Sequence, residues 1–335
     1  MAIIDFGKKY SDKPLMIMLI GVPGSGKTTI AKELSHEYNA VVCSSDAKRK
    51  ELYGDESTQG SPSEVFLNLH KDILFYLRTG CNVIYDATNV RRKNRESFLQ
   101  FLKQSNVDCY RIAWVVAPPI EECLVYDQER ERKVGKEVIM RMVQAFEFPQ
   151  YFEGWNEILI WDHENSLLPY NRDLANQIDE LMDNFDQKNP WHFEDLGHHS
   201  RRVQAWAYGK YDIKKSHING VALQVAARYH DVGKLYTQTL DERGVAHYYG
   251  HPQVGAYFMT SHLELMPAMD LTMEDVYFIL FLVNYHMFPF NFKEEKTTKK
   301  WKDKFGSYWF DALMLLHEAD KEATSEEARS DTRRY

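Results

Sequence analysis

The nine residues GVPGSGKTT, at positions 21–29, constrain the fold of this chain more than any other stretch. They fit the pattern G-x-x-x-x-G-K-[ST], and they directly follow the apolar run LMIMLI at 15–20. Ile30, Leu34 and Tyr38 then recur at helical spacing. A phosphate-binding loop needs this context, because its backbone N–H groups and the N-terminus of the following helix together face the phosphates. An accidental glycine-rich turn would lack it, so the stretch predicts a triphosphate-binding loop in an α/β domain.

The loop residues share the task of holding a nucleotide. The glycines let the backbone curl, Lys27 reaches the β- and γ-phosphates, and Thr28 supplies an oxygen to Mg²⁺. We expect ATP or another nucleoside triphosphate, together with Mg²⁺, to be bound by Gly21, Gly24, Ser25, Gly26, Lys27, Thr28 and Thr29. The motif does not identify the acceptor of the phosphate.

Strand and helix patterns alternate through the first half of the chain. Apolar runs such as AVVCS, NVIYDATN, CYRIAWVVA and EILIW are separated by amphipathic stretches, which predicts a parallel sheet flanked by helices. From about residue 162 the pattern becomes mostly helical, and 11 of the 13 histidines follow Tyr151. We expect an α/β domain at 1–163, a polar connector at 164–187 and an all-α domain at 188–335.

Composition excludes several classes of protein. A length of 335 residues suggests two domains at about 150 residues each. No apolar run reaches the roughly 20 residues that span a membrane, and the N-terminus shows no signal peptide, so we expect a cytoplasmic protein. The net charge of −8 argues against a protein that coats nucleic acid, but not against one that acts on its ends. The four cysteines form no CxxC pair, which indicates reduced, packed thiols.

Charged residues follow the next two predicted strands, at the edge where an open α/β sheet binds its ligands. In SSDAKRK (44–50), Asp46 can take the proton from an attacking hydroxyl, and Arg49 can pair with a phosphate on the acceptor. The alternative is that Asp46 caps a helix and Arg49 is a surface residue. In YDATN (85–89), Asp86 can organise Mg²⁺ water or the acceptor, or can simply occupy a turn.

Two basic stretches have open interpretations. ERERK (129–133) places Arg130 and Arg132 ahead of a helix, where a flexible segment can fold over the donor phosphates as a lid. The alternative is a charged helix face. KEEKTTKKWKDK (293–304) is expected to be a solvated loop, with a basic rim for a phosphate chain as the alternative.

The first half resembles the P-loop polynucleotide 5′-hydroxyl kinase family over residues 14–162. The resemblance is carried by GVPGSGKTT, SSDAKR, DATNVRRKNR and RERKVGKEVIMRMVQAFEFPQYFEGW. It implies that Asp46 is the general base, that Arg49 contacts the acceptor and that Arg130 contacts the donor phosphates. P-loop kinases of small metabolites share much of this pattern.

The lid departs from that family. Its lid often reads R-N-x-x-R, whereas Tyr126 and Asp127 occupy the first two of those positions here. One lid contact must therefore come from elsewhere, and Arg132 is the candidate, which would add it to Arg130 among the nucleotide-binding residues.

Histidines and carboxylates recur in the helical second half. YHDVGK places His230 and Asp231 at the end of an apolar run, and each of four further residues lies in or beside another helical stretch: His199, His251, His286 and Asp320. A helical bundle can project such residues onto one site, and imidazole and carboxylate ligands suit divalent transition metals. Any one of these histidines alone is more often a surface or packed residue.

The order H…HD…H…H…D resembles the HD phosphohydrolase superfamily over about residues 188–325, with NPWHFEDLGHHSRRV and GHPQVGA as further points of likeness. The resemblance implies one or two divalent transition metals, with catalytic roles for His230 and Asp231. The first metal would be held by His199, His230, Asp231 and Asp320. Asp231 would bridge to a second, completed by His251 and His286.

The same resemblance lets Lys234 steady a substrate phosphate. His198 is the alternative to its neighbour His199, and His192 has no assigned role. HD domains that keep the fold without activity exist, so metal binding alone would not establish hydrolysis.

Together the two resemblances imply RNA end healing, as in bacterial or phage-infected cells. The kinase would phosphorylate a polynucleotide 5′-hydroxyl with ATP, and the HD domain would remove 2′,3′-cyclic or 2′-phosphate ends. The implied partners are nucleic-acid ends, RNA above all, and a separate RNA ligase, with no membrane. One alternative is a nucleoside or metabolite kinase fused to a nucleotide phosphohydrolase, and another is an HD domain that senses ligands without turnover. The sequence leaves open RNA against DNA, the metals and the oligomeric state.

Overall fold

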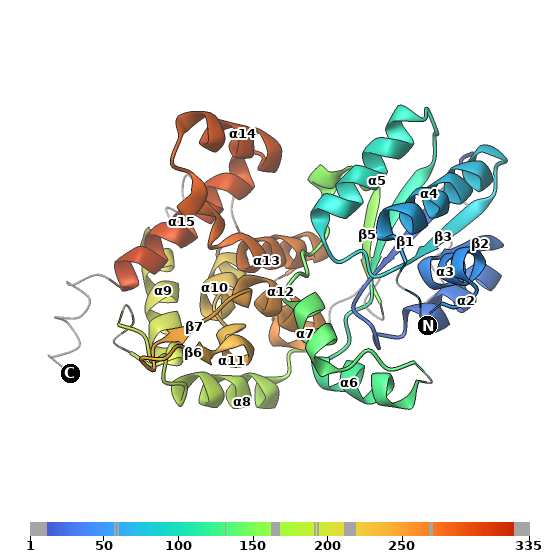
Figure 1. The fold of residues 1–335 in the computed structure, drawn as a ribbon. Coiled ribbons are helices and arrows are strands. Elements are labelled where there is room, and N and C mark those ends of the chain that lie inside the picture. Colours follow the sequence, from blue (N-terminus) through green and yellow to red (C-terminus); the bar gives the residue numbers. More distant parts are fainter. Residues whose placement is uncertain are drawn as a thin grey trace, which may run out of the picture. The chain divides into compact units, whose positions relative to one another are not determined.

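Five parallel strands in the order β2-β3-β1-β4-β5 form the sheet of the N-terminal half (Figure 1). Their bounds are β1 Leu15–Ile20, β2 Ala40–Ser44, β3 Asn82–Asp86, β4 Tyr110–Val115 and β5 Glu157–Ile160. Every residue of the central strand β1 is buried, because neighbouring elements cover both of its faces. The predicted parallel sheet flanked by helices is confirmed.

The computed structural model describes residues 12–56, 58, 60–130, 132–161, 168–190, 192, 194–210, 219–267 and 271–324. The chain divides into two compact units, residues 1–164 and 165–335. No helix in the described ranges has both the length and the apolar character needed to cross a membrane.

Helices and one short turn complete the first unit. They are α2 Lys27–Glu37, α3 Ser45–Tyr53, α4 Pro62–Arg78, α5 Arg92–Gln104, α6 Ile120–Glu129, α7 Lys136–Val143 and the 3₁₀ turn η1 Tyr151–Glu153. The apolar positions of α2 pack on the sheet, where Ile30 and Leu34 join Ile17, Ile84 and Ile112 in one buried cluster. This packing fixes the start of α2 at the carboxyl end of β1, where the phosphate-binding loop lies.

A buried ion pair holds the segment after β3. Both guanidinium nitrogens of Arg95 that face Glu153 donate to its carboxylate, at 2.7 and 2.8 Å, and both side chains are fully buried. Arg95 also donates to the backbone carbonyls of Asn89 and Val90. A paired and fully hydrogen-bonded charge is the form in which arginine tolerates burial, so this pair orders the chain immediately after the Asp86 strand end.

The second unit is mostly helical. Its helices are α8 Arg172–Asp183, α9 Leu196–Lys210, α10 Gly220–Tyr229, α11 Lys234–Thr237, α12 His251–Ser261, α13 Met273–Tyr285, α14 Glu295–Phe305 and α15 Ser307–Ala323, with 3₁₀ turns η2 Leu263–Leu265 and η3 Phe288–Asn291. Helix α13 is buried on all sides from residue 276 to 285, which makes it the central helix. Helices α9, α10, α12 and α15 pack around this unit's core.

Three features of the second unit differ from the sequence prediction. The connector expected at 164–187 contains α8, whose buried Ala175, Ile178 and Met182 pack it into the second unit. The loop expected at 293–304 is instead helix α14, because Trp301 and Phe305 on one of its faces contact Phe288 and other aromatic rings. The all-α domain also includes a short antiparallel hairpin, β6 Thr239–Leu240 and β7 Ala246–His247.

Candidate active sites

The phosphate-binding loop joins β1 to α2, and two of its glycines cannot be replaced without strain. Gly24 and Gly26 have φ angles of 79° and 89°, in the left-handed region. A Cβ on Gly24 would lie 2.2 Å from the Cys123 carbonyl oxygen, and one on Gly21 would lie 2.3 Å from the Val116 carbonyl oxygen. The glycines at 21, 24 and 26 are therefore required by backbone conformation and close packing.

Lys27 is buried at the start of α2, beside the loop. Its Nζ donates to the Val22 carbonyl at 2.7 Å and to Ser25 Oγ at 3.2 Å. Burial lowers the pKa of Lys27 to about 8; Asp86 opposes that shift and Arg130 adds to it. An anionic phosphate in the loop would restore the charged form, as a lysine that binds phosphates requires.

Thr28 and Asp86 meet at the same edge of the sheet. Thr28 Oγ1 donates to Asp86 Oδ2 at 3.2 Å, although Thr28 lies in the first turn of α2 and Asp86 ends β3. Burial raises the pKa of Asp86, while Lys27 and Thr28 lower it. A hydroxyl and a carboxylate at this spacing are oxygen ligands of the kind that Mg²⁺ prefers, so these residues fit a magnesium ion.

Asp46 lies in the first turn of α3 but does not cap it. The cap is Ser44, whose Oγ accepts from the Asp46 backbone N–H at 3.3 Å. The Asp46 carboxylate is partly exposed and is paired with Arg49, whose Nη1 donates at 2.7 Å. The structure thus rules out the alternative of an Asp46 helix cap and places both side chains together.

The segment between α6 and α7 is anchored by a buried aspartate. Asp127 is fully buried, and its carboxylate accepts from the backbone N–H groups of Val134 and Gly135 at 2.9–3.1 Å. The flexible lid expected from the sequence is therefore tied at its far end. The sequence marked Asp127 only as a departure from a family pattern, because nothing local shows that its partners lie in the next loop.

The two lid arginines lie on different sides of the site. Arg130 is exposed at the end of α6, and its charge acts on Lys27 and Asp86. Arg132 Nη1 instead donates to the Glu56 carbonyl at 2.8 Å and lies 3.7 Å from Asp46 Oδ1. Arg132 was expected to bind the nucleotide, but in this structure it contacts the Asp46 side.

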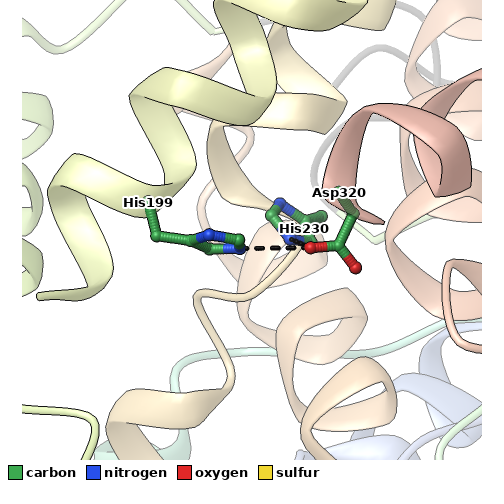
Figure 2. A group of neighbouring side chains, drawn as sticks. All are labelled: His199, His230 and Asp320. Atoms are coloured by element: carbon green, nitrogen blue, oxygen red, sulfur yellow. Dashed lines mark ion pairs between the residues drawn. The ribbon is translucent and has the colours of Figure 1, made fainter. Parts of the chain in front are cut away.

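The second unit brings six of the predicted metal ligands together. His199 comes from α9, His230 and Asp231 follow α10, His251 begins α12, His286 follows α13 and Asp320 lies near the end of α15. They form two groups whose candidate ligand atoms lie within 4.8 Å of one another: His199, His230 and Asp320, and Asp231, His251 and His286. Figure 2 shows the first group, with His199 and Asp320 reaching toward each other at 3.2 Å and His230 beside them.

The two oxygens of Asp231 face different histidines. Oδ1 lies 3.1 Å from His251 Nε2 and 3.4 Å from His286 Nε2. Oδ2 lies 3.3 Å from His230 Nε2 and 3.6 Å from His199 Nε2. This is the arrangement that a carboxylate bridging two ions needs.

Backbone carbonyls fix the orientation of three of these histidines. Nδ1 of His230, His251 and His286 each lies 2.8–2.9 Å from the carbonyl oxygen three residues earlier. Each Nδ1 therefore carries a proton, so that in its neutral form each ring presents an Nε2 lone pair toward Asp231. For His230, burial lowers the pKa but the Asp231 carboxylate raises it, and the net direction is upward. Burial also lowers the pKa of His286 to about 4, which keeps that ring in its neutral, metal-binding form at neutral pH.

With neutral rings, the resulting arrangement suits a bound metal ion. The Nε2 atoms of His251 and His286 lie 3.1 Å apart, and two lone pairs at that distance repel each other and the Asp231 carboxylate. Nε2 of His199 and of His230 is buried with no hydrogen-bond partner among the described residues. Buried acceptors without donors are costly unless an ion satisfies them. The residues present therefore fit one or two divalent transition metals.

Lys234 lies beside this centre. Its Nζ is 2.7 Å from Asp231 Oδ2, and it donates to Gln187 Oε1 at 3.0 Å and contacts His192 Nε2 at 3.2 Å. His192, which had no role in the sequence analysis, thus lies within the site. His198 is exposed and pairs with Asp195 at 2.7 Å, so His199 and not His198 faces Asp231.

Several known proteins match part of this chain. Residues 16–149 match the family described as AAA domain, which is less than half of the chain. A 6-phosphofructo-2-kinase/fructose-2,6-bisphosphatase of Aquarana catesbeiana is 27% identical over 129 residues, covering 33% of this chain and 27% of the relative. The human 6-phosphofructo-2-kinase/fructose-2,6-bisphosphatase 1 is 24% identical over 144 residues, covering 38% and 30%. The chain thus spans under a third of these relatives.

Solved structures give partial likenesses. A Pnkp1/Rnl/Hen1 RNA repair complex matches 40% of this chain and 44% of that chain, at 24% identity and a TM-score of 0.35. A fungal RNA kinase matches 51% and 44%, at 17% identity and a TM-score of 0.34. The APS kinase CysC of Mycobacterium tuberculosis matches 45% and 90%, at 16% identity and a TM-score of 0.35.

The first unit therefore has a P-loop kinase fold. The phosphate-binding loop, the parallel sheet and the matched family support nucleotide binding. The matched family ends at residue 149, before the metal-ligand cluster of the second unit.

Proposed function

We propose that this chain heals polynucleotide ends, phosphorylating a 5′-hydroxyl in its first unit and removing 2′,3′-cyclic or 2′-phosphates in its second. One observation carries the proposal. A P-loop with a carboxylate near two arginines, and six candidate metal ligands in two groups, occur in one chain. Adding a 5′-phosphate and clearing a 3′ end are the two steps that prepare a broken strand for a separate ligase, RNA being the expected substrate.

In the kinase reaction, each residue near the loop has a distinct role. Lys27 and Arg130 hold the donor phosphates, while Thr28 and Asp86 supply oxygens for Mg²⁺. Asp46 takes the proton from the attacking 5′-hydroxyl, and Arg49 and Arg132 hold the phosphate next to it on the acceptor. In the structure the two arginines neutralise Asp46, and an acceptor phosphate would draw them away and leave the carboxylate free to accept the proton.

In the second unit, the chain itself supplies fixed ligands and a cation. Carbonyls hold the rings of His230, His251 and His286, and Asp231 faces both groups of ligands. A divalent metal bound there supplies Lewis acidity and lowers the pKa of a water molecule. Lys234 donates a proton in a hydrogen bond to a phosphate oxygen of the substrate, and its burial excludes competing water.

One oligonucleotide tests both halves. An RNA with a 5′-hydroxyl and a 2′,3′-cyclic phosphate is incubated with the chain, ATP, Mg²⁺ and Mn²⁺, and both ends are analysed. Asp46→Asn should lower 5′ phosphorylation by about 100-fold or more and leave the 3′ reaction unchanged. His230→Ala should do the reverse, because it removes a metal ligand and leaves the P-loop site intact.

Full 5′-kinase activity in Asp46→Asn would contradict the assigned base, provided ATP affinity is equal in both proteins. Unchanged 3′ processing in His230→Ala would contradict the phosphohydrolase site. RNA and DNA versions of the same oligonucleotide, compared side by side, give the nucleic-acid preference.

The curated relatives favour a second candidate, a small-molecule kinase joined to a phosphohydrolase. The matched proteins are themselves named as a kinase and a bisphosphatase of sugar phosphates. Phosphorylation of free nucleosides or sugars, together with no reaction on the oligonucleotide, would support this candidate and exclude end healing.

A further inference from the structure

Helix α14 is a locally basic segment of an acidic chain. Residues 293–304 contain six lysines and three carboxylates, whereas the whole chain has a net charge of −8. Of these lysines, Lys302 is paired with Asp311 at 2.9 Å. Lys296 and Lys300 are exposed, and neither has an ion-pair partner among the described residues. Part of the positive charge of α14 is therefore available to an anion.

Three lysines of α14 form one row on its surface. Lys296, Lys300 and Lys304 follow one another at intervals of four residues, so they lie on one face of the helix, about 6 Å apart along its axis. The Nζ atoms of Lys300 and Lys304 lie 5.7 and 5.2 Å from the centre of the same ring, that of Trp301. Like charges one turn apart destabilise a helix, and an anion lying along the row would relieve that repulsion.

Aromatic packing attaches this row to elements that carry the metal ligands. The 3₁₀ turn η3 follows His286 and precedes α14. In that turn, Phe288 packs edge-on against Trp301, with ring centres 4.7 Å apart. Phe290, from the same turn, packs edge-on against His317 of α15, with ring centres 4.5 Å apart. Helix α14 is thus fixed to the end of α13 and to α15, and each of these two helices brings a ligand to the metal centre.

We propose that the row formed by Lys296, Lys300 and Lys304 binds the phosphates of a single-stranded polynucleotide whose 3′ end lies at the metal centre. The separation of the lysines along the helix is comparable to that of neighbouring phosphates in an extended single strand, so each ammonium can contact one phosphate. Contacts of this kind position the strand without reading its bases. The inference rests on the polynucleotide substrate of the proposed function, and it adds binding contacts away from the reacting end.

Salt-dependent binding of a single strand tests the row. A single-stranded RNA of about ten nucleotides carries a dye on its 5′ end, so that no 5′-hydroxyl remains for the kinase site. It is titrated with the full chain and followed by fluorescence anisotropy. A variant with Lys296→Gln, Lys300→Gln and Lys304→Gln should bind at least about tenfold more weakly at about 0.1 M salt. The slope of its log affinity against log salt concentration should be smaller by about 2, because three phosphate contacts are lost.

Two further variants separate charge from structure. Lys→Arg at the same three positions keeps the charges, and this variant should bind within about threefold of the unmodified chain. The matched control is a variant with the same change in net charge at exposed lysines of the first unit, Lys32→Gln, Lys71→Gln and Lys103→Gln. Its affinity for the RNA should equal that of the unmodified chain. Mn²⁺ content should be equal in all four proteins, which shows that the ligand set of the second unit is intact.

Equal affinity and equal salt dependence in the α14 glutamine variant and the unmodified chain would overturn the inference, as would equal weakening in the first-unit control. Binding of anionic lipid vesicles through the row, without binding of the RNA, would also overturn it. If the RNA binds as expected but no 2′,3′-cyclic end is processed, the inference stands and the proposed hydrolysis fails. If such ends are processed while the lysine substitutions change nothing, the proposed function stands and the inference fails.

Discussion

At the scale of single residues, two arginines on one short loop have different partners. Arg130 acts electrostatically on Lys27 and Asp86, whereas Arg132 reaches the Glu56 carbonyl and lies 3.7 Å from Asp46. Removing each arginine should therefore weaken the binding of a different substrate, although only one residue separates the two in sequence.

We predict that Arg130→Ala raises the KM for ATP about tenfold with little effect on the KM for the polynucleotide. Arg132→Ala should raise the KM for the polynucleotide about tenfold with little effect on the KM for ATP. The reason is that Arg130 acts on Lys27 and Asp86 whereas Arg132 lies near Asp46, so that we expect each guanidinium to pair with a different phosphate. Steady-state kinetics with each substrate varied in turn checks this. Arg141→Ala, at an exposed position on α7, is the control. Equal effects of both variants on the KM for ATP would show that Arg132 binds the donor after all.

At the scale of elements, Asp127 joins α6 to the start of α7. Its carboxylate accepts three backbone contacts from Val134 and Gly135. We therefore expect this buried carboxylate to contribute to the stability of the loop.

Asp127→Ala should expose the loop to trypsin at Arg132 and Lys133. Losing these hydrogen bonds costs about 1–3 kcal/mol, so the open form and its cleavage rate should rise at least about fivefold. Limited proteolysis followed by mass spectrometry measures it. Glu129→Ala removes an exposed carboxylate at the end of the same helix, and trypsin should cleave this variant at the rate of the unmodified chain. Equal cleavage of the two variants would argue against the anchor.

Helix α4 packs on the sheet partly through His70. Its Nε2 lies 3.0 Å from the Tyr85 hydroxyl, and its ring contacts Phe98 and Phe101. Burial lowers the pKa of His70 to about 4, below the value of 6.5 in the unfolded chain. The unfolded state therefore binds a proton first, and stability should fall as pH drops from 6.5 toward 4.

We predict that between pH 7 and pH 5 the first unit loses about 2 kcal/mol of stability through His70. His70→Gln can keep the contact with Tyr85 but does not titrate, so it should lose less over the same range. Urea unfolding at both pH values, monitored for the transition that ATP shifts, gives the difference. An identical pH dependence in the two proteins would exclude His70 as its source.

At the scale of the whole molecule, the chain divides into two compact units, residues 1–164 and 165–335. The nucleotide loop lies in the first unit and the metal-ligand groups in the second. A ligand that binds only the folded form of one unit stabilises that unit by mass action.

Calorimetry of the full chain should show this separation. ATP with Mg²⁺, at about 100 times its dissociation constant, should raise the midpoint temperature of one unfolding transition by roughly 5–10 °C. Removal of transition metal by a chelator should lower the midpoint temperature of the other transition. Lys27→Ala should abolish only the first effect and His230→Ala only the second. A single transition that responds to both ligands would contradict independent units.

Much of the secondary structure of the first unit could be predicted from patterns in short stretches of sequence. The strand β1, the glycine loop and α2 follow one another within residues 15–37, so hydrophobic periodicity and glycine spacing suffice to predict them. Helix α14 was missed because its lysine-rich sequence becomes helical only when Trp301 and Phe305 pack against rings such as Phe288. That contact is invisible to a reading of 293–304 alone.

The sequence by itself determined the P-loop, the alternation of strands and helices and, through motif order, which histidines and aspartates to suspect of metal binding. Only the tertiary structure decided that Asp231 faces two groups of ligands, that His192 joins Lys234 and that Arg132 lies near Asp46. The physical reason is reach along the chain. Glycine loops and helical periodicity depend on neighbours a few residues apart. His199 and Asp320 are far apart in sequence, and they meet only when α9 and α15 pack together, with several helices between them along the chain.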